Sequence, residues 1–304
     1  MIRFGLVCLW HSSEISGYRA MTASQFEKLD SSRYEVLWNR ISENADILFQ
    51  SITRLADHQI TSLRVTSGLL PLSTHLKWGY IPQEIPEQII DRFKQCGDLA
   101  RERGVRLSFH PGQYNQLASP TTTSVRRNTL MDLDTHAILA EWLGIDVINI
   151  HGGGTYGVKD ATKRDLISAI HDLPDAIRSR LTLENDEKSW DVRSLVDVSV
   201  ETDVPIVFDV HHHRCYRDPL PISEATELAF TTWGDREPLF HISSPRDGWG
   251  SSNPCAHADY IDPDDFPIEW LYPSRPFTLD VEAKHKEFAV RRLRDSYNGK
   301  LSTF

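Results

Sequence analysis

The chain has 304 residues, of which 40% are hydrophobic and 25% charged, and its formal net charge at pH 7 is -10. This composition is ordinary for a folded globular protein and excludes a largely disordered or fibrous chain. The acidic balance argues against a protein that contacts nucleic acid mainly through a broad basic surface.

Apolar runs and amphipathic segments alternate from the N-terminus onward. Residues 2–9 are expected to form a strand and not a signal peptide, because the run turns polar at His11 without a small-residue cleavage site. Residues 36–57 carry apolar side chains at the spacing of one helical face, which predicts a helix. A strand over 60–66 and a helix over 86–103 are expected next.

The same alternation continues to the C-terminus. Helices are expected over 121–143, 161–178, 192–200 and 223–232, with one more at the C-terminus. Short apolar strands are expected to end at His110, His151, Glu184, Asp209, His241 and Glu282. Apolar strands that alternate with helices are typical of a parallel sheet, and eight such units close into a barrel. We therefore expect an α/β fold, a (β/α)8 TIM barrel with residues 1–304 as a single domain. A doubly wound open sheet is the alternative, but it would gather ligands at one switch point and not on nearly every strand.

These strand ends predict a metal centre, because active sites of TIM barrels lie at the C-terminal ends of the strands. One buried histidine is more often a hydrogen-bonded core residue, but six polar groups at one mouth would be costly to bury without a partner. The run His211 to His213 adds candidates, since strand alternation would let two of the three face alike, and His257 lies in a loop near the same mouth.

The ligand types narrow the metal and the chemistry. Mixed imidazole and carboxylate ligands suit Mn, Zn or Fe, and they argue against a site for Ca or Mg made of oxygen alone. Eight ligands exceed what one tetrahedral ion binds, so two or three divalent transition metal ions are expected. Clustered ions of this kind serve the hydrolysis of phosphoesters.

Seven motifs of the sequence belong together. They are Ser108–Tyr114, Asn149–Gly153, Leu183–Glu187, Phe208–His212, Phe240–Ser243, Ala256–Ala258 and Val281–Lys284. With them the chain resembles the UV damage endonucleases (UVDE/UvsE type), which are related in fold to endonuclease IV. The resemblance spans most of the chain and implies a metal-dependent DNA repair endonuclease, commonly a manganese enzyme, that nicks damaged double-stranded DNA on the 5′ side of UV photoproducts.

The resemblance also implies site residues. The metal ligands would be His110, His151, Glu184, Asp209, His212, His241, His257 and Glu282. Four of these, Glu184, Asp209, His241 and Glu282, are the expected catalytic residues. Gln113 and Tyr114 would be inserted into the DNA at the lesion, where an aromatic side chain can stack in place of a displaced base. His211 and His213 are expected to be structural.

Three positions depart from the family pattern. Leu239 stands where members often have a lysine that can be modified, and Leu6 and Trp10 stand where some members have a Tyr and an Asn that face the lesion. A different lesion preference is therefore expected, with catalysis retained.

The remaining expectations concern partners and rivals. The four cysteines are far apart and form no Cys-x-x-Cys pair, which predicts reduced thiols and a cytoplasmic protein. No stretch approaches the ~20 apolar residues of a membrane span, so no membrane partner is expected, and we expect a monomer. Basic residues near strand ends are candidates for phosphate contacts: Arg64, Lys159, Lys188, Arg246, Lys284 and Lys286. The rival hypotheses are a metal-dependent sugar isomerase or epimerase on a related barrel and a catalytically inactive lesion-binding protein.

Overall fold

The computed structural model describes residues 1–301, and within them eight parallel strands close into a barrel in chain order. The strands are β1 (Ile2–Val7), β2 (Ser62–Val65), β3 (Arg106–Phe109), β4 (Ile148–His151), β5 (Leu181–Glu184), β6 (Ile206–Asp209), β7 (Leu239–Ile242) and β8 (Phe277–Val281). The last strand pairs with the first, which removes every sheet edge. The expected (β/α)8 barrel is confirmed.

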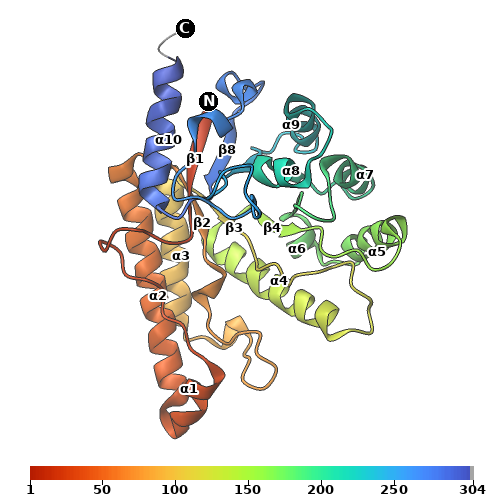
Figure 1. The fold of residues 1–304 in the computed structure, drawn as a ribbon. Helices are drawn as coiled ribbons and strands as arrows, with labels where there is room; N and C mark the ends of the chain where they lie inside the picture. Colours follow the sequence, from red (N-terminus) through yellow and green to blue (C-terminus); the bar gives the residue numbers. More distant parts are fainter. Residues whose placement is uncertain (302–304) are drawn as a thin grey trace.

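Helices surround the strands (Figure 1). They are α1 (Ala23–Lys28), α2 (Arg33–Leu55), α3 (Glu87–Glu102), α4 (Ser124–Leu143), α5 (Lys159–His171), α6 (Asp175–Arg178), α7 (Val192–Thr202), α8 (Val210–Tyr216), α9 (Ile222–Thr231) and α10 (Lys286–Leu301). The longest, α2, buries Leu37, Ile41, Leu48 and Ile52 on one face, as its apolar spacing predicts. Within residues 1–301, none of the helices has the length and apolar character that a membrane crossing needs.

One expected helix is divided. The segment 161–178 forms α5 and α6 as separate helices, and Pro174 precedes the first residue of α6. Proline lacks a backbone N–H and its ring clashes with the preceding turn, so it begins a new helix more easily than it continues an old one. Further along the chain, α4 ends as expected at Gly144, whose φ of 67° places it in the left-handed region that favours glycine.

The expectation that the three histidines extend a strand is wrong. Asp209 ends β6 and its side chain accepts a hydrogen bond from the backbone N–H of His212 at 2.8 Å, which caps α8. On a helix, successive side chains point about 100° apart. His213 is therefore turned into the protein, where its Nε2 lies 2.9 Å from the carbonyl oxygen of Leu220.

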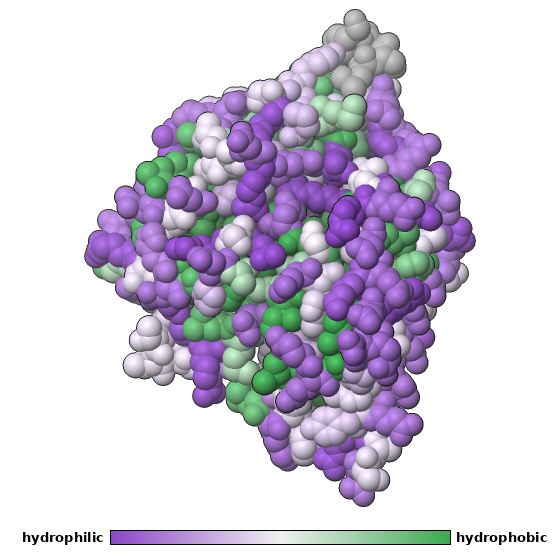
Figure 2. Space-filling view, turned by 180° about the vertical axis from the view of Figure 1, so that it is seen from behind, coloured by the Kyte–Doolittle hydropathy of each residue, from purple (hydrophilic) through white to green (hydrophobic). Residues whose placement is uncertain are grey.

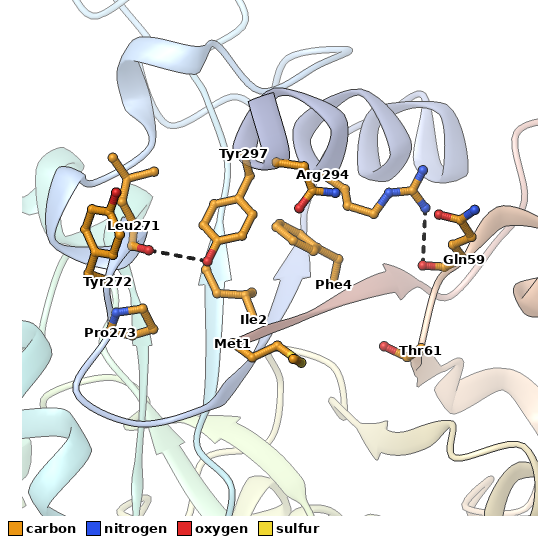
Figure 3. Close-up of a pocket in the computed structure, with 11 residues that line it drawn as sticks. Met1, Ile2, Phe4, Gln59, Thr61, Leu271, Tyr272, Pro273, Arg294 and Tyr297 are labelled. Atoms are coloured by element: carbon orange, nitrogen blue, oxygen red, sulfur yellow. Dashed lines mark hydrogen bonds between the residues drawn. The ribbon is translucent and has the colours of Figure 1, made fainter. Parts of the chain in front are cut away.

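The largest cavity described here lies at the N-terminal end of the strands, away from the predicted ligands. It measures about 590 Å³ and is bordered by the start of β1, the segment around Tyr272 and the face of α10 (Figure 3). The guanidinium of Arg294 already donates to the carbonyl oxygens of His58, at 2.5 Å, and Gln59, at 3.2 Å.

Seen from behind, the molecule is mainly hydrophilic, with hydrophobic residues in small separate groups (Figure 2).

Candidate active site

The expected ligands lie together at the C-terminal ends of the strands. Their positions are His110 directly after β3, His151 at the end of β4, Glu184 at the end of β5, Asp209 at the end of β6, His241 within β7 and Glu282 directly after β8. Parallel strands of a barrel end at one mouth, so residues far apart in the sequence meet there.

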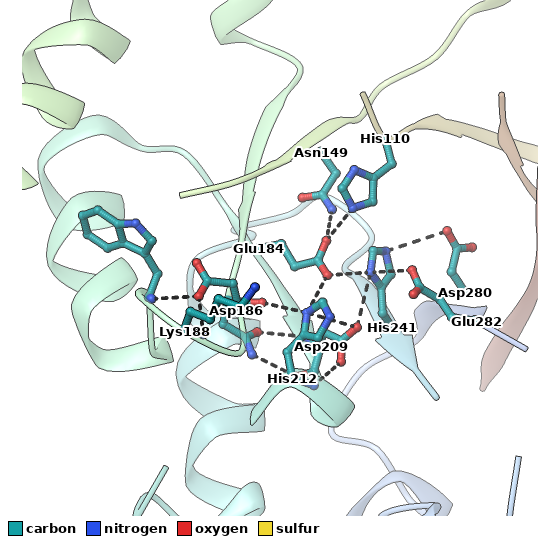
Figure 4. Close-up of polar contacts among 12 residues, drawn as sticks. His110, Asn149, Glu184, Asp186, Lys188, Asp209, His212, His241, Asp280 and Glu282 are labelled. Atoms are coloured by element: carbon teal, nitrogen blue, oxygen red, sulfur yellow. Dashed lines mark hydrogen bonds and ion pairs between the residues drawn. The ribbon is translucent and has the colours of Figure 1, made fainter. Parts of the chain in front are cut away.

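Glu184 is the centre of this cluster and is fully buried. Its Oε2 lies 2.9 Å from Nε2 of His110, and its Oε1 lies 3.2 Å from Nδ1 of both His212 and His241 (Figure 4). His110 Nδ1 lies 3.1 Å from the carbonyl oxygen of Pro111. A proton donated there leaves the lone pair of His110 Nε2 facing the carboxylate, which is the arrangement a metal ligand needs.

The second half of the cluster centres on Glu282. Its Oε1 lies 3.4 Å from Nδ1 of His241, and Oδ2 of Asp209 lies 3.9 Å from the same nitrogen. His257 comes from the loop between β7 and β8, which an isolated bridge to Pro245 holds in place. Its Nδ1 lies 3.5 Å from Oε2 of Glu282, so the loop histidine does reach the mouth of the barrel.

Seven of the eight expected ligands fall into three overlapping groups. The groups are His110 with Glu184 and His241, His151 with Glu184 and His212, and Asp209 with His241 and Glu282, each with its ligand atoms within 4.8 Å. Bonds of about 2.0–2.2 Å put two ligand atoms of one ion at most about 4.4 Å apart, and the separations of 2.9–3.9 Å fall within this limit. Glu184 and His241 each belong to two groups, so ions bound there would be neighbours.

The residues fit divalent metal ions. Buried polar atoms in proteins are nearly always hydrogen-bonded, yet Glu184 Oε1, Asp209 Oδ2 and both ring nitrogens of His241 have no such partner among the residues described. Of these atoms, Glu184 Oε1 and Asp209 Oδ2 lie 3.2 and 3.9 Å from Nδ1 of His241, whereas Nε2 of His241 lies on the other side of the ring. Imidazole and carboxylate groups left unsatisfied together are what a Mn, Zn or Fe site requires.

The electrostatics of the cluster also favour cations. Burial opposes ionisation of Glu184, but His241, His151 and His110 outweigh it and hold the pKa of this carboxyl well below its usual range. Burial likewise lowers the pKa of His110, which favours the neutral imidazole that binds metals. Burial also opposes the charged forms of His212 and His241, but the neighbouring carboxylates, Glu184 among them, outweigh it and raise the pKa of both imidazoles. The cluster thus holds ionised carboxylates that attract cations, whether protons on the imidazoles or metal ions.

Two asparagines that the sequence analysis did not single out support the carboxylates. Asn149 Nδ2 donates to Glu184 Oε2 at 2.5 Å and is itself held by Thr182 at 3.0 Å. Asn185 bonds both backbone groups of Asp209, each at 2.9 Å. A signal existed for Asn149, since it precedes His151 by two residues and strand alternation puts both on one face.

Arg64 corrects a prediction. It was a candidate for phosphate contacts, but it is buried, with Nε 3.3 Å from Oδ2 of Asp280 and a direct bond to Glu282. Its positive charge therefore balances carboxylates inside the barrel. Lys188 is the contrasting case, with a side chain that is 80% exposed at the rim.

The loop after β3 carries the expected lesion residues at the surface. Tyr114 is 81% exposed. Gln113 lines a hollow of about 170 Å³ that also reaches His151 and Lys188. The two residues thus stand beside the ligand cluster, free of the core.

The three departures from the family pattern lie in the interior or against it. Leu6 is fully buried, and Trp10 packs against the core with its ring 5.1 Å from that of His58. Leu239 belongs to a small apolar cluster with Val147, Val207 and Trp233. Leu6 and Trp10 are therefore packing residues in this chain.

Comparisons with known proteins show the family of this chain. The model of the family UV-endonuclease UvdE matches residues 2–303. A UV DNA damage endonuclease of Bacillus cereus (strain B4264) is 30% identical over 315 residues, covering 97% of this chain and 94% of the relative. The solved structure of SacUVDE is 26% identical, with a TM-score of 0.86 and 99% of each chain covered. Endonuclease IV from Thermus thermophilus, 14% identical with a TM-score of 0.61 over 98% of this chain and 99% of that one, shares the fold.

Proposed function

Since this chain belongs to the UV-endonuclease UvdE family and is a DNA repair endonuclease, we propose that it binds two or three divalent transition metal ions and nicks damaged duplex DNA on the 5′ side of UV photoproducts. Manganese is the proposed resident metal. The observation that carries this proposal is the set of unpartnered ligand atoms on Glu184, Asp209 and His241 at one mouth of the barrel.

The eight ligands would hold the ions, while Asn149 supports the carboxylate of Glu184 and Asn185 supports the backbone of Asp209. Ions bound there would polarise a water for attack and would offset negative charge on the attacked phosphate and the leaving oxygen. Glu184 and His241 bridge the groups, and Asp209 and Glu282 close the far side. Asn149 prevents Glu184 from rotating away, because it fixes Oε2 while Oε1 stays free for a ligand role.

We propose that Gln113 and Tyr114 read the lesion. A photoproduct is poorly stacked and paired, so displacing it from the duplex costs less than displacing a normal base. In this proposal the exposed Tyr114 fills the resulting gap from the loop that follows β3. Lys188, at the rim of the same hollow, is the proposed contact to the phosphate backbone.

We further propose that the protein acts as a monomer, with residues 1–304 as one domain, in the cytoplasm. Its four cysteines are free thiols, which fits a reducing compartment. Sedimentation of the purified protein tests the monomer, since a mass of one chain is expected and that of two or more would contradict it.

The test of the proposed function is cleavage of UV-irradiated supercoiled plasmid in the presence of Mn²⁺. Nicking should depend on irradiation and on the metal, and a duplex with one photoproduct and an end label should be cut on the 5′ side of the lesion. Equal nicking of unirradiated plasmid, or a cut on the 3′ side, would contradict the proposal. Binding without cleavage would indicate an inactive lesion-binding protein, and turnover of a ketose sugar would indicate an epimerase.

A further inference from the structure

Asp280 is a buried carboxylate beneath the ligand cluster with no role in the function proposed so far. It lies in β8 two residues before Glu282, so both side chains belong to the same face of the strand. It is fully buried, and neither carboxylate oxygen has a hydrogen-bond partner among the residues described. Its nearest charged neighbours are Arg64 Nε at 3.3 Å and His241 Nε2 at 3.9 Å (Figure 4).

The fold makes room for this carboxylate. Gly5 in β1 is the register partner of Asp280. A Cβ added to Gly5 would collide with Oδ1 of Asp280. A side chain at position 5 would therefore force the carboxylate of Asp280 out of its present position.

His241 connects Asp280 to the candidate metal centre. Its Nδ1 faces Glu184 and Glu282, while its Nε2 faces Asp280 on the other side of the ring. A neutral imidazole carries one proton, so one nitrogen is a donor and the other an acceptor. Metal binding at Nδ1 requires the proton on Nε2, where an acceptor would hold it.

We propose that Asp280 is a positioning residue, which accepts a hydrogen bond from Nε2–H of His241 and so keeps Nδ1 available for a metal ion. This inference rests on the metal binding proposed above. The contact must shorten from 3.9 Å to ~2.9 Å, because hydrogen bonds of active sites are often long in the free protein and tighten on binding.

Arg64 completes the arrangement. Its guanidinium contacts Asp280 and Glu282 at once, so the positioning carboxylate and a proposed ligand are tied to one rigid group. Arg64 also balances the charge of Asp280, which makes a buried carboxylate tolerable there. If Asp280 had only a structural role, it would act as the partner of Arg64 alone and would not affect His241.

The experiment compares three variants by Mn²⁺ affinity and by the imidazole ¹⁵N spectrum of His241. Asp280→Asn removes the charge, and Gly5→Ala displaces the carboxylate while keeping its charge. Glu237→Gln is the matched control, because it alters a partly buried, ion-paired carboxylate at the opposite end of the barrel. Spectra are taken at pH 8 on metal-free and Zn²⁺-loaded protein, with the His241 signals assigned by a His241→Gln variant.

Both Asp280→Asn and Gly5→Ala should weaken Mn²⁺ binding by about 10–100-fold, the usual effect of losing a partner of a ligand histidine. Both should also move the His241 proton from Nε2 toward Nδ1, and Glu237→Gln should do neither. The proposal is overturned if Asp280→Asn keeps wild-type affinity and an unchanged His241 spectrum, whatever its melting temperature. A loss of affinity in Asp280→Asn but not in Gly5→Ala would indicate charge alone, and an equal loss in Glu237→Gln would indicate general destabilisation.

The same data separate this inference from the proposed function. If wild-type protein binds no Mn²⁺ or Zn²⁺, the metal proposal fails. The metal-free spectra then still decide whether the Nε2–H of His241 depends on Asp280.

Discussion

The two ends of the barrel handle buried charge in opposite ways. At the N-terminal end, Arg3 pairs with Glu237 at 2.9 Å, and Arg106 pairs with Asp146 at 2.8 Å. Thr278 connects the two, since its hydroxyl donates to Glu237 and accepts from Arg106. At the C-terminal end, carboxylates and imidazoles face one another with several atoms unpartnered among residues 1–301.

The paired charges of the N-terminal end contribute to stability, whereas the unpartnered groups of the C-terminal end are available for chemistry. A network that satisfies its own charges needs no ligand, and removing one member can only cost stability. A cluster with excess ligand atoms is unfavourable by itself and becomes favourable when cations bind it. The layer between the ends, with Arg64 and Asp280, has features of both, since the pair balances its charge but leaves carboxylate oxygens free.

The largest expected effect comes from Glu184→Gln, which breaks the unsatisfied end. The variant keeps the side-chain volume but loses a ligand shared by two groups. Nicking of UV-irradiated plasmid should fall by more than the ~10–100-fold typical of groups that only support a ligand. Without metal, the Tm of the variant should equal or exceed that of wild type. Cleavage at the wild-type rate would remove Glu184 from the catalytic set.

Metal addition should stabilise the protein through the C-terminal end of the barrel and not through the N-terminal end. A ligand at 100 times its Kd stabilises the folded state by about 2.7 kcal/mol per site, which corresponds to about 4 °C in Tm for a domain of this size. Mn²⁺ should therefore raise the Tm of wild type, and EDTA should reverse the rise. Glu237→Gln should retain this response while Glu184→Gln loses most of it. An identical response in both variants would argue against the cluster as the binding site.

Tyr114→Ala tests the loop outside the ligand cluster. Stacking on a base contributes ~1–3 kcal/mol, so affinity for a photoproduct duplex should fall by roughly one to two decades. Affinity for undamaged duplex should change far less, because phosphate contacts dominate it. Metal content should remain normal. Equal binding of the damaged duplex by variant and wild type at one salt concentration would mean that another residue reads the lesion.

The smallest expected effect is on the satisfied end. Burial raises the pKa of Glu237, but Arg3, Thr278 and Arg106 outweigh it and lower the pKa. The interaction therefore stabilises fully above the unfolded-state value of about 4.3, and its contribution is lost as the pH falls through the lower folded-state pKa. Because the side chain is 31% exposed, Glu237→Gln should cost only about 1 kcal/mol at pH 7. Its Tm deficit relative to wild type should shrink below about pH 4, and a deficit independent of pH would contradict the ionic explanation.

Parts of the site were predictable because they follow from strand position. Glu184 and Asp209 are the last residues of four-residue, largely apolar strands, and a parallel barrel brings all such ends to one mouth. His212 was chosen among the three histidines through the family motifs, whereas His257 was already a candidate from its loop near the mouth. The helical conformation around His212 was missed because Asp209 caps it, and the same residue also ends the strand.

The sequence by itself determined the barrel and the chemical type of its mouth, because apolar period and strand-end residues are local patterns that closure merely gathers. Only the tertiary structure decided that the side chain of Arg64 points into the barrel and that Asp280 faces His241. Both depend on which side chains meet across β8, β1 and β2, whose neighbours come from opposite ends of the chain. A charge near a strand end looks the same in the sequence whether it faces solvent or the interior, and only the closed barrel distinguishes the two.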